Sequence, residues 1–444
     1  MKIKYYLLFL IVFSFSASAQ QAFSLKEAVT YAIKNSVNVK NSQVDIASAE
    51  YRIKEIKAAG LPQVNGQFQF SSNVIVPTSL IAAKNFNPAA AEGDVMKVKF
   101  GVPWGGQVGI GINQLIFDAT WLVGLRAADT YRQLAQGGLK QSKLAVTESV
   151  MKAYYGVLVA EERNKLLTLN VGRLDSLIRD TRALQQQGFV EKIDLDRLQV
   201  QRNNLVTEQM KVNNLIQLSY QLLKFQMGYG LENPISLTDK LSETEVNTLK
   251  MLQVSNVDYA NRIEYSLLQS QRKLTELDIE SKYKGYLPKV FFSGSLGMGH
   301  SNPRFNPFER WFPASTLTLG VQIPIFDSGM KKYQIEQSKL NLIKIDQSAN
   351  LLRQSFDLQA DQANIMLKNG LETLETQKRN MELAQEIVRV TKIKYQQGLG
   401  SNIEVINAEA SLKESQTNYF ASLYDVLIAK VDLDKAMGNL SISE

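Results

Sequence analysis

The sequence QVGIGIN at residues 107–113 alternates polar or glycine residues with branched apolar ones. This period of two is typical of a β-strand with one apolar face, because successive side chains of a strand point to opposite sides. Three further segments show the same alternation, and we predict strands at 64–71, 290–298 and 316–323 as well. We expect each strand to extend slightly beyond its alternating segment to about nine to eleven residues, the length that a tilted membrane strand requires.

Lipid and water are the predicted environments of the two strand faces. The apolar face includes Val108, Ile110, Leu319 and Val321, whereas glycine and small hydroxyl residues crowd the other face, as a water-filled lumen permits. Aromatic residues gather near the strand ends, where membrane girdles lie. They are Trp104, Phe117, Trp121, Trp311, Phe312 and Phe326. A hairpin packed against a soluble core is the alternative interpretation.

A membrane location would require assembly. No segment after the first twenty residues carries the roughly twenty consecutive apolar residues of a membrane helix, so entry into a membrane would need a closed β-barrel. Four strands cannot close a barrel, and hydrocarbon does not tolerate an open sheet edge. The sequence therefore predicts an obligate oligomer.

The chain consists of two repeated halves. Four motifs occur twice in the same order, and from the second motif onwards their spacings agree to within one residue. They are Leu61-Pro62 and Leu287-Pro288, Phe117-Asp118 and Phe326-Asp327, Gln187-Gly188 and Gln397-Gly398, and Met227-Gly228 and Met437-Gly438. We predict a first repeat at 20–228, a linker or equatorial segment at 229–255 and a second repeat at 256–444. Each repeat would hold a helix, a β-hairpin and a long helical hairpin.

The first nineteen residues predict a secretory signal peptide. Lys2 and Lys4 precede an apolar run at 5–15, and the small residues Ala17-Ser18-Ala19 follow. The apolar run is too short to span a bilayer as a helix. The chain also contains no cysteine, so neither disulfides nor a lipid attached to cysteine can hold it in place.

Long helices are predicted where proline is missing, at 105–233 and 325–444, since a helix interior excludes proline. The segment 119–187 alone would reach about 100 Å as one helix, whereas 74–106 is predicted as a long loop. Two seams with spacings of three and four indicate coiled-coil packing. One seam is Leu367, Leu371, Leu374, Lys378, Met381, Ala384, Val388, Thr391 and Tyr395. The other is Ile403, Ile406, Ala410, Lys413, Thr417, Phe420, Tyr424, Leu427 and Val431.

Several classes of function are disfavoured by composition. One histidine and no cysteine leave little material for a metal site, and His300 lies in a Gly/Ser/Asn-rich stretch that suggests a solvated loop. No catalytic or phosphate-binding motif occurs, so we expect neither an enzyme nor a cofactor. The net formal charge of +7 is spread along the helices without a basic stripe, so we expect no nucleic-acid partner.

The ordered motifs resemble those of the TolC-like outer-membrane efflux protein family over nearly the whole chain after the signal peptide. The opening helix carries Tyr31-Ala32-Ile33-Lys34-Asn35, and the paired Leu-Pro, Phe-Asp and Gln-Gly motifs follow in both halves. Each motif alone is common. Their order and duplication make the resemblance specific.

The resemblance implies an α+β membrane channel. Three copies would contribute four strands each to one twelve-stranded barrel in outer-membrane lipid, and their helices would continue it as a coiled-coil barrel through the periplasm. Such a channel passively conducts substrates from a periplasmic adaptor and an inner-membrane transporter to the exterior. Type I protein secretion uses the same architecture and is the alternative. A coiled-coil adhesin or stalk is less favoured, because it would not need two lipid-facing hairpins.

The resemblance also implies where a gate would lie. Asp194 and Glu404 match positions of constriction acids, Glu191 lies nearby, and Tyr395 matches a tyrosine that holds the closed tip in some relatives. Asn407 replaces a second acid of those relatives, and Gly400 replaces a basic residue. The hairpin turns are assigned to Gly188, Gly398 and Gly400. The alternative is that these acids only stabilise the first turn of a helix, where a negative charge interacts favourably with the helix dipole.

Overall fold

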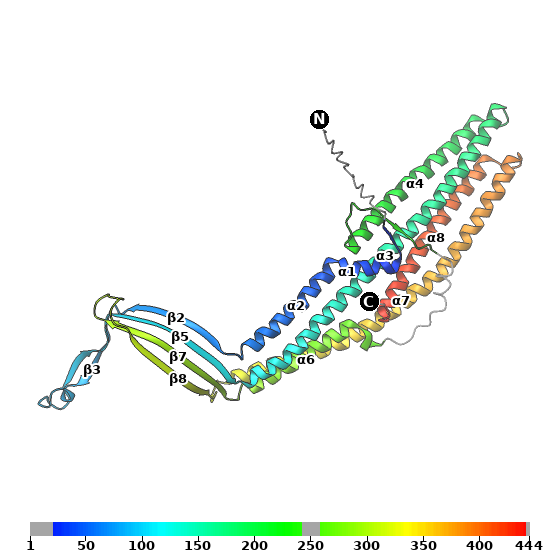
Figure 1. Ribbon diagram of the computed structural model, residues 1–444. Helices are drawn as coiled ribbons and strands as arrows, with labels where there is room; N and C mark the ends of the chain where they lie inside the picture. Colours follow the sequence, from blue (N-terminus) through cyan, green and yellow to red (C-terminus); the bar gives the residue numbers. More distant parts are fainter. Residues whose placement is uncertain (1–20, 242–257, 441–444) are drawn as a thin grey trace, which may run out of the picture. The chain divides into compact units, whose positions relative to one another are not determined.

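The computed structural model describes residues 21–241 and 258–440, which divide into two compact units (Figure 1). One unit comprises the chain up to Asp45, Gln136–Leu267 and the chain from Ser348 onwards. The other comprises Ile46–Ala135 and Leu268–Gln347. The predicted signal peptide lies outside the described residues, as does part of the predicted linker. The proposed repeat boundaries therefore stay a prediction.

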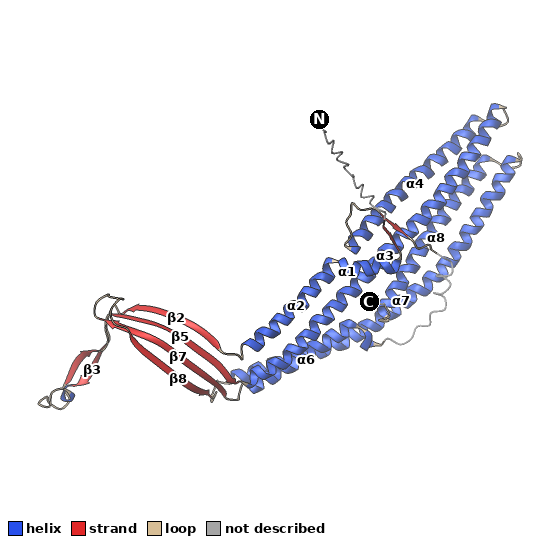
Figure 2. Ribbon diagram, in the orientation of Figure 1, coloured by secondary structure: helices blue, strands red, loops and turns tan. Residues whose placement is uncertain are grey.

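The second unit contains a four-stranded antiparallel sheet, drawn red in Figure 2. Its strands are β2 (Gln63–Ser72), β5 (Trp104–Phe117), β7 (Lys289–Asn302) and β8 (Phe312–Gln322), and they lie in the order β2-β5-β7-β8. All four predicted strands are present. The two central strands are longer than predicted, at 14 residues each.

The strand register brings the predicted apolar residues onto one face of this sheet. Phe68 pairs with Val108, which pairs with Met298, and Ile110 pairs with Leu296. On the other face, Gly109 lies between Gln67 and Gly297. The apolar face is open in the single chain, with Ile110 60% and Leu319 70% exposed. A sheet with an exposed apolar face needs another apolar medium to cover it.

The long loop between β2 and β5 is more ordered than predicted. It contains a second hairpin, in which β3 (Thr78–Ala82) pairs with β4 (Val95–Lys99). A short 3₁₀ helix, Ala83–Asn85, follows β3. The prediction of a long loop over 74–106 missed this hairpin, because five-residue strands are too short for a convincing alternation.

His300 was also assigned wrongly, as a solvated loop residue. It belongs to β7 and is only 3% exposed, with its ring stacked on Trp311 at a centroid distance of 5.4 Å. Its Nδ1 lies 3.2 Å from the carbonyl oxygen of Arg310. Trp104, Phe70 and Phe305 form a second aromatic cluster near this end of the sheet. The neighbours of His300 in the sequence are polar, so nothing in the sequence indicated that its ring is buried against Trp311.

Each strand pair leads into a long helix through a Phe-Asp motif. Asp118 accepts a hydrogen bond from Thr120 N (2.8 Å) before α3 (Ala119–Gln186), and Asp327 accepts one from Gly329 N (3.1 Å) before α7 (Met330–Gln396). A carboxylate at this position satisfies amide groups that a helix start leaves unpaired. This capping explains why the motif occurs in both halves.

Two helices of equal length precede the strand pairs. They are α2 (Val37–Ala58) and α6 (Ile263–Lys284), of 22 residues each. In the second unit, the indole nitrogen of Trp121 donates to the carbonyl oxygen of Ile56 (2.8 Å), which ties α3 to α2. Arg272 forms an ion pair with Asp346 (2.8 Å), which ties α6 to α7.

The first unit is built from long helices. The C-terminal part of α3 pairs with α4 (Lys192–Met227), and the C-terminal part of α7 pairs with α8 (Asn402–Ala436) (Figure 1). The prediction of one continuous helix over 119–187 is confirmed to within one residue. Among the described residues, no helix has an apolar window long enough to cross a membrane.

A small substructure joins distant parts of this unit. β1 (Gln21–Phe23) pairs in parallel with β6 (Ile235–Leu237), and α1 (Leu25–Asn35) follows β1. The short helix Tyr259–Asn261 precedes α6. The Asp239 carboxylate accepts from Leu25 N (2.8 Å) and from the buried Tyr154 hydroxyl (3.0 Å). Burial and the nearby Asp239 carboxylate both raise the pKa of Tyr154.

The two predicted seams had different outcomes. Along α7, Leu367, Leu374, Ala384, Val388 and Tyr395 are buried, as predicted. Along the first half of α8 the predicted seam was wrong: Ile403 is 47% exposed and Ala410 is exposed. The residues buried there are Asn402, Val405, Ala408, Glu409, Leu412 and Gln416. The spacing of apolar residues did not predict this buried stripe, because the stripe includes polar residues.

Candidate functional site

The two long helical hairpins end in matching turns. Gly188 follows α3 with a φ of +79°, and Gly398 follows α7 with a φ of +70°. Residues with a side chain rarely adopt this left-handed conformation, so glycine is favoured at both positions. Gly400 has a different role, because a Cβ there would lie 3.1 Å from the Cβ of Lys394. Close packing in the turn requires a small residue at this position.

Asp194 and Asn402 connect the two hairpin tips. The Nδ2 of Asn402 lies 2.6 Å from the carbonyl oxygen of Asp194 and 3.2 Å from its carboxylate, and it donates to both. Asn402 is only 4% exposed. The Asp194 carboxylate is also 3.7 Å from Arg197. Asn402 was not predicted as a tip residue, because an asparagine at a helix start gives no signal of a contact with another hairpin.

Tyr395 lies in the interior between the hairpins. It is 7% exposed, and its hydroxyl is 3.4 Å from the hydroxyl of Thr181. Burial raises the pKa of Tyr395, so its hydroxyl stays neutral and can donate a hydrogen bond. This contact joins the last turn of α7 to α3 near the hairpin tips.

Glu191 and Glu404 are both exposed at the tips. Glu191 is the N-cap residue of α4, although its side chain forms no capping hydrogen bond there. Glu404 lies in the first turn of α8, where its backbone amide donates to Ser401 Oγ (3.4 Å). Both placements are also consistent with the alternative in which these acids only stabilise a helix start through the helix dipole.

A ladder of buried polar contacts continues from the tip along α3 and α8. Arg173 forms an ion pair with Glu409 (3.0 Å), and Asn170 donates to Gln416 (2.6 Å). Arg173 also donates to Asn170 (2.7 Å), which links the two contacts. We expect these contacts to favour one register of α3 and α8, because another register would leave buried polar groups unpaired.

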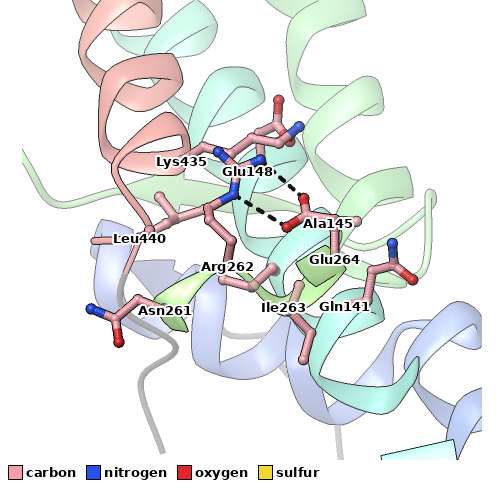
Figure 3. Close-up of a pocket in the computed structure, with 11 residues that line it drawn as sticks. Gln141, Ala145, Glu148, Asn261, Arg262, Ile263, Glu264, Lys435 and Leu440 are labelled. Atoms are coloured by element: carbon pink, nitrogen blue, oxygen red, sulfur yellow. Dashed lines mark hydrogen bonds and ion pairs between the residues drawn. The ribbon is translucent and has the colours of Figure 1, made fainter. Parts of the chain in front are cut away.

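A cavity of about 150 Å³ lies elsewhere in the first unit, beside the start of α6 and the end of α8 (Figure 3). Its charged lining residues pair with one another: Glu148 with Lys435 (2.8 Å) and Arg262 with Glu264 (3.2 Å). Burial opposes ionisation of Glu148, but Lys435 and Lys152 still lower its pKa. Arg262 also donates to the carbonyl oxygen of Ala436 (2.8 Å). These contacts indicate a junction between helix ends.

The described residues include no group of three or more histidine, aspartate or glutamate side chains placed to hold a metal ion. Two features of the described residues could serve function: the two-faced sheet and the polar hairpin tips.

Comparison with known proteins agrees with these features. Residues 261–439 match the family model described as outer membrane efflux protein. The outer membrane protein TolC of Vibrio cholerae is 19% identical over 441 residues, covering 96% of this chain and 93% of the relative. The proteases secretion protein PrtF of Dickeya chrysanthemi is 22% identical over 331 residues, covering 70% of this chain and 63% of the relative.

Solved structures share the fold. CusC has a TM-score of 0.72 at 13% identity, with 93% of this chain and 92% of that chain covered. The Campylobacter jejuni CmeC outer membrane channel has a TM-score of 0.71 at 15% identity, with 95% and 87% covered. The mixed helix and strand fold is therefore that of outer membrane channels, which confirms the coarse fold prediction.

The chain is similar to members of the TolC-like outer membrane efflux protein family, by a family model over residues 261–439 and by relatives and solved structures over most of its length. It is an outer membrane component of an efflux system, as the resemblance of its motifs predicted. Relatives in this family are channels and not enzymes.

Proposed function

We propose that three copies of the chain close one twelve-stranded barrel and passively conduct substrates out of the cell. The observation that carries this proposal is the four-stranded sheet with an exposed apolar face. Its edge strands β2 and β8 have no further strand beside them among the described residues. Open edges are unstable in lipid, and pairing of β8 with β2 of the next copy would remove every edge.

The helices would extend the barrel into the periplasm as a coiled-coil barrel. There the tips would meet a periplasmic adaptor and an inner-membrane transporter, which select and drive the cargo. Efflux is the main function we propose, since relatives include the toluene efflux pump outer membrane protein TtgC of Pseudomonas putida. Protein secretion is the second candidate, because the similar PrtF is a proteases secretion protein.

Two measurements on one preparation test this proposal. The mature chain, purified from outer membranes in detergent, is expected to have about three times its monomer mass. The same sample should form discrete conducting channels in planar bilayers. A folded, stable monomer would contradict the proposed assembly, and a trimer without channel activity would contradict the proposed function.

We also propose that Asp194 and Glu404 contribute to an acidic constriction at the tips. Each lies six residues beyond its turn glycine, so the repeat gives both the same place in their hairpins. Threefold symmetry would bring six carboxylates around one opening, and such a ring attracts cations. The contact between Asp194 and Asn402 supports the proposal, because it holds one acid against the other hairpin.

Neutralising both acids with Asp194→Asn and Glu404→Gln is expected to lower the preference for cations over anions several-fold in planar-bilayer recordings. Asp196→Asn is the matched control, because Asp196 is an exposed acid two residues beyond Asp194 on the same helix. If the double variant keeps the selectivity of the wild type, both acids only stabilise the helix starts and do not form a constriction.

A further inference from the structure

Phe291 places an aromatic ring on the polar face of the sheet. Along β7 this face carries serine or glycine at every second position from Ser293 to Ser301. Phe291 lies on the same face, two residues before Ser293. Phe291 pairs with Leu115 on β5 and with Gly320 on β8, near the end of the sheet where the long helices begin. Phe291 remains 39% exposed.

The backbone of β8 leaves space for the Phe291 ring. A Cβ at Gly320 would lie 2.4 Å from Cζ of Phe291, which is closer than side chains approach one another. The ring therefore reaches across to the neighbouring strand and rests over the glycine. A phenylalanine held in this way lines the wall of the sheet instead of projecting from it.

The surroundings of Phe291 separate it from the girdle residues. Phe312 also lies on the polar face, at the first residue of β8, but the Arg310 guanidinium is 5.6 Å from its ring centroid. The charged neighbour of Phe291 on its own strand is Lys289, which forms an ion pair with Asp118 (2.8 Å). Phe291 and Leu115 thus form an apolar patch beside a neutralised ion pair.

We propose that Phe291 is a cargo-contacting residue of the lumen that retards molecules carrying an aromatic ring. This inference rests on the proposed trimeric channel, in which three copies of the patch would surround the passage. Twelve strands about 4.8 Å apart and tilted by about 40° close a ring roughly 24 Å across. Rings lying along such a wall leave the passage open, so they act by contact with the cargo.

Aromatic cargo is the class that this surface suits. Aromatic rings attract one another in offset or edge-to-face arrangements, which a saturated ring of the same size and charge cannot reproduce. A competing explanation is that Phe291 only shields Gly320 and so stabilises the sheet. That explanation predicts an effect on stability and no effect on how long a cargo stays.

The test compares two organic cations in planar bilayers, naphthylmethylammonium and its fully saturated analogue. In wild-type channels, current fluctuations should give a residence time three to ten times longer for the aromatic cation. Phe291→Leu should abolish this difference, whereas Phe291→Tyr should retain it. Phe292→Leu is the matched control, because Phe292 is the next residue on β7 and lies on the opposite, apolar face.

Each variant is first checked for trimer mass and open-channel conductance, so a failure of the proposed assembly is recognised separately. An unchanged preference for the aromatic cation in Phe291→Leu overturns the inference, and so does an equal loss in Phe292→Leu. Phe291→Met provides a second apolar replacement if the leucine variant does not assemble. If neither variant assembles, Phe291 is a structural residue and the inference is also overturned.

Discussion

Arginine in place of Ile110 or Leu319 is expected to cost about 2–4 kcal/mol each, because both residues would lie on the lipid face near the middle of a membrane strand. In the single chain both side chains are more than half exposed on the apolar face. A guanidinium there would have to enter hydrocarbon or draw water towards it. The expected result is a strong loss of assembled protein in outer membranes, measured by the yield of trimer after extraction.

The control for these variants is Thr318→Arg. Thr318 precedes Leu319 on β8 and lies on the polar face, opposite Ser293. An arginine in a water-filled lumen keeps its hydration, so this variant should assemble nearly as well as the wild type. Equal assembly of all three arginine variants would mean that neither face of the sheet contacts lipid.

Removal of the Glu409 carboxylate by Glu409→Ala is expected to destabilise the helical part by about 3 kcal/mol. Loss of one partner from a buried ion pair leaves an uncompensated charge, which typically costs about 3–5 kcal/mol. The lower end applies because the Arg173 side chain keeps 26% of its surface exposed, whereas the Glu409 side chain keeps 3%. The measurement is the thermal unfolding of the purified assembly, followed by the loss of helical signal.

Glu414→Ala is the control for that loss, since Glu414 is an exposed glutamate five residues further along α8. It should unfold at nearly the wild-type temperature. If both glutamate variants unfold alike, the polar ladder between α3 and α8 does not contribute to stability.

Much of this fold could be predicted from the sequence, because its signals repeat. The alternation at 107–113 and the duplicated Phe-Asp motifs identified strands and helix starts, and the register then placed Val108 and Ile110 on one face. Proline-free stretches predicted the long helices, since proline disrupts a helix interior. These features depend on local spacing, which a sequence displays directly.

The remaining features depend on contacts between distant residues. Glu409 and Gln416 look like surface residues until Arg173 and Asn170 are brought beside them. The residues around His300 in the sequence suggest a polar loop, although its ring stacks on Trp311 in the fold. At the candidate tip site, the sequence indicated the turn glycines and the acids, but not the buried Asn402 that joins the two hairpins.

Cross-linking of the edge strands tests the central claim most directly. The chain has no cysteine, so a small panel of variants with one cysteine at Gln67 or Gln69 and one at Thr316 or Thr318 introduces the only thiols. Within one chain, β5 and β7 separate these strands by about 14 Å, beyond the roughly 7 Å limit between Cα atoms of a disulfide. A disulfide can therefore form only between copies.

Mild oxidation in outer membranes is expected to link one or more of these pairs into covalent dimers and trimers, with no larger species, because three copies close the ring. Reduction should return every product to the monomer. Protein that stays monomeric throughout the panel, or a ladder that continues beyond three copies, would contradict a closed barrel of three chains.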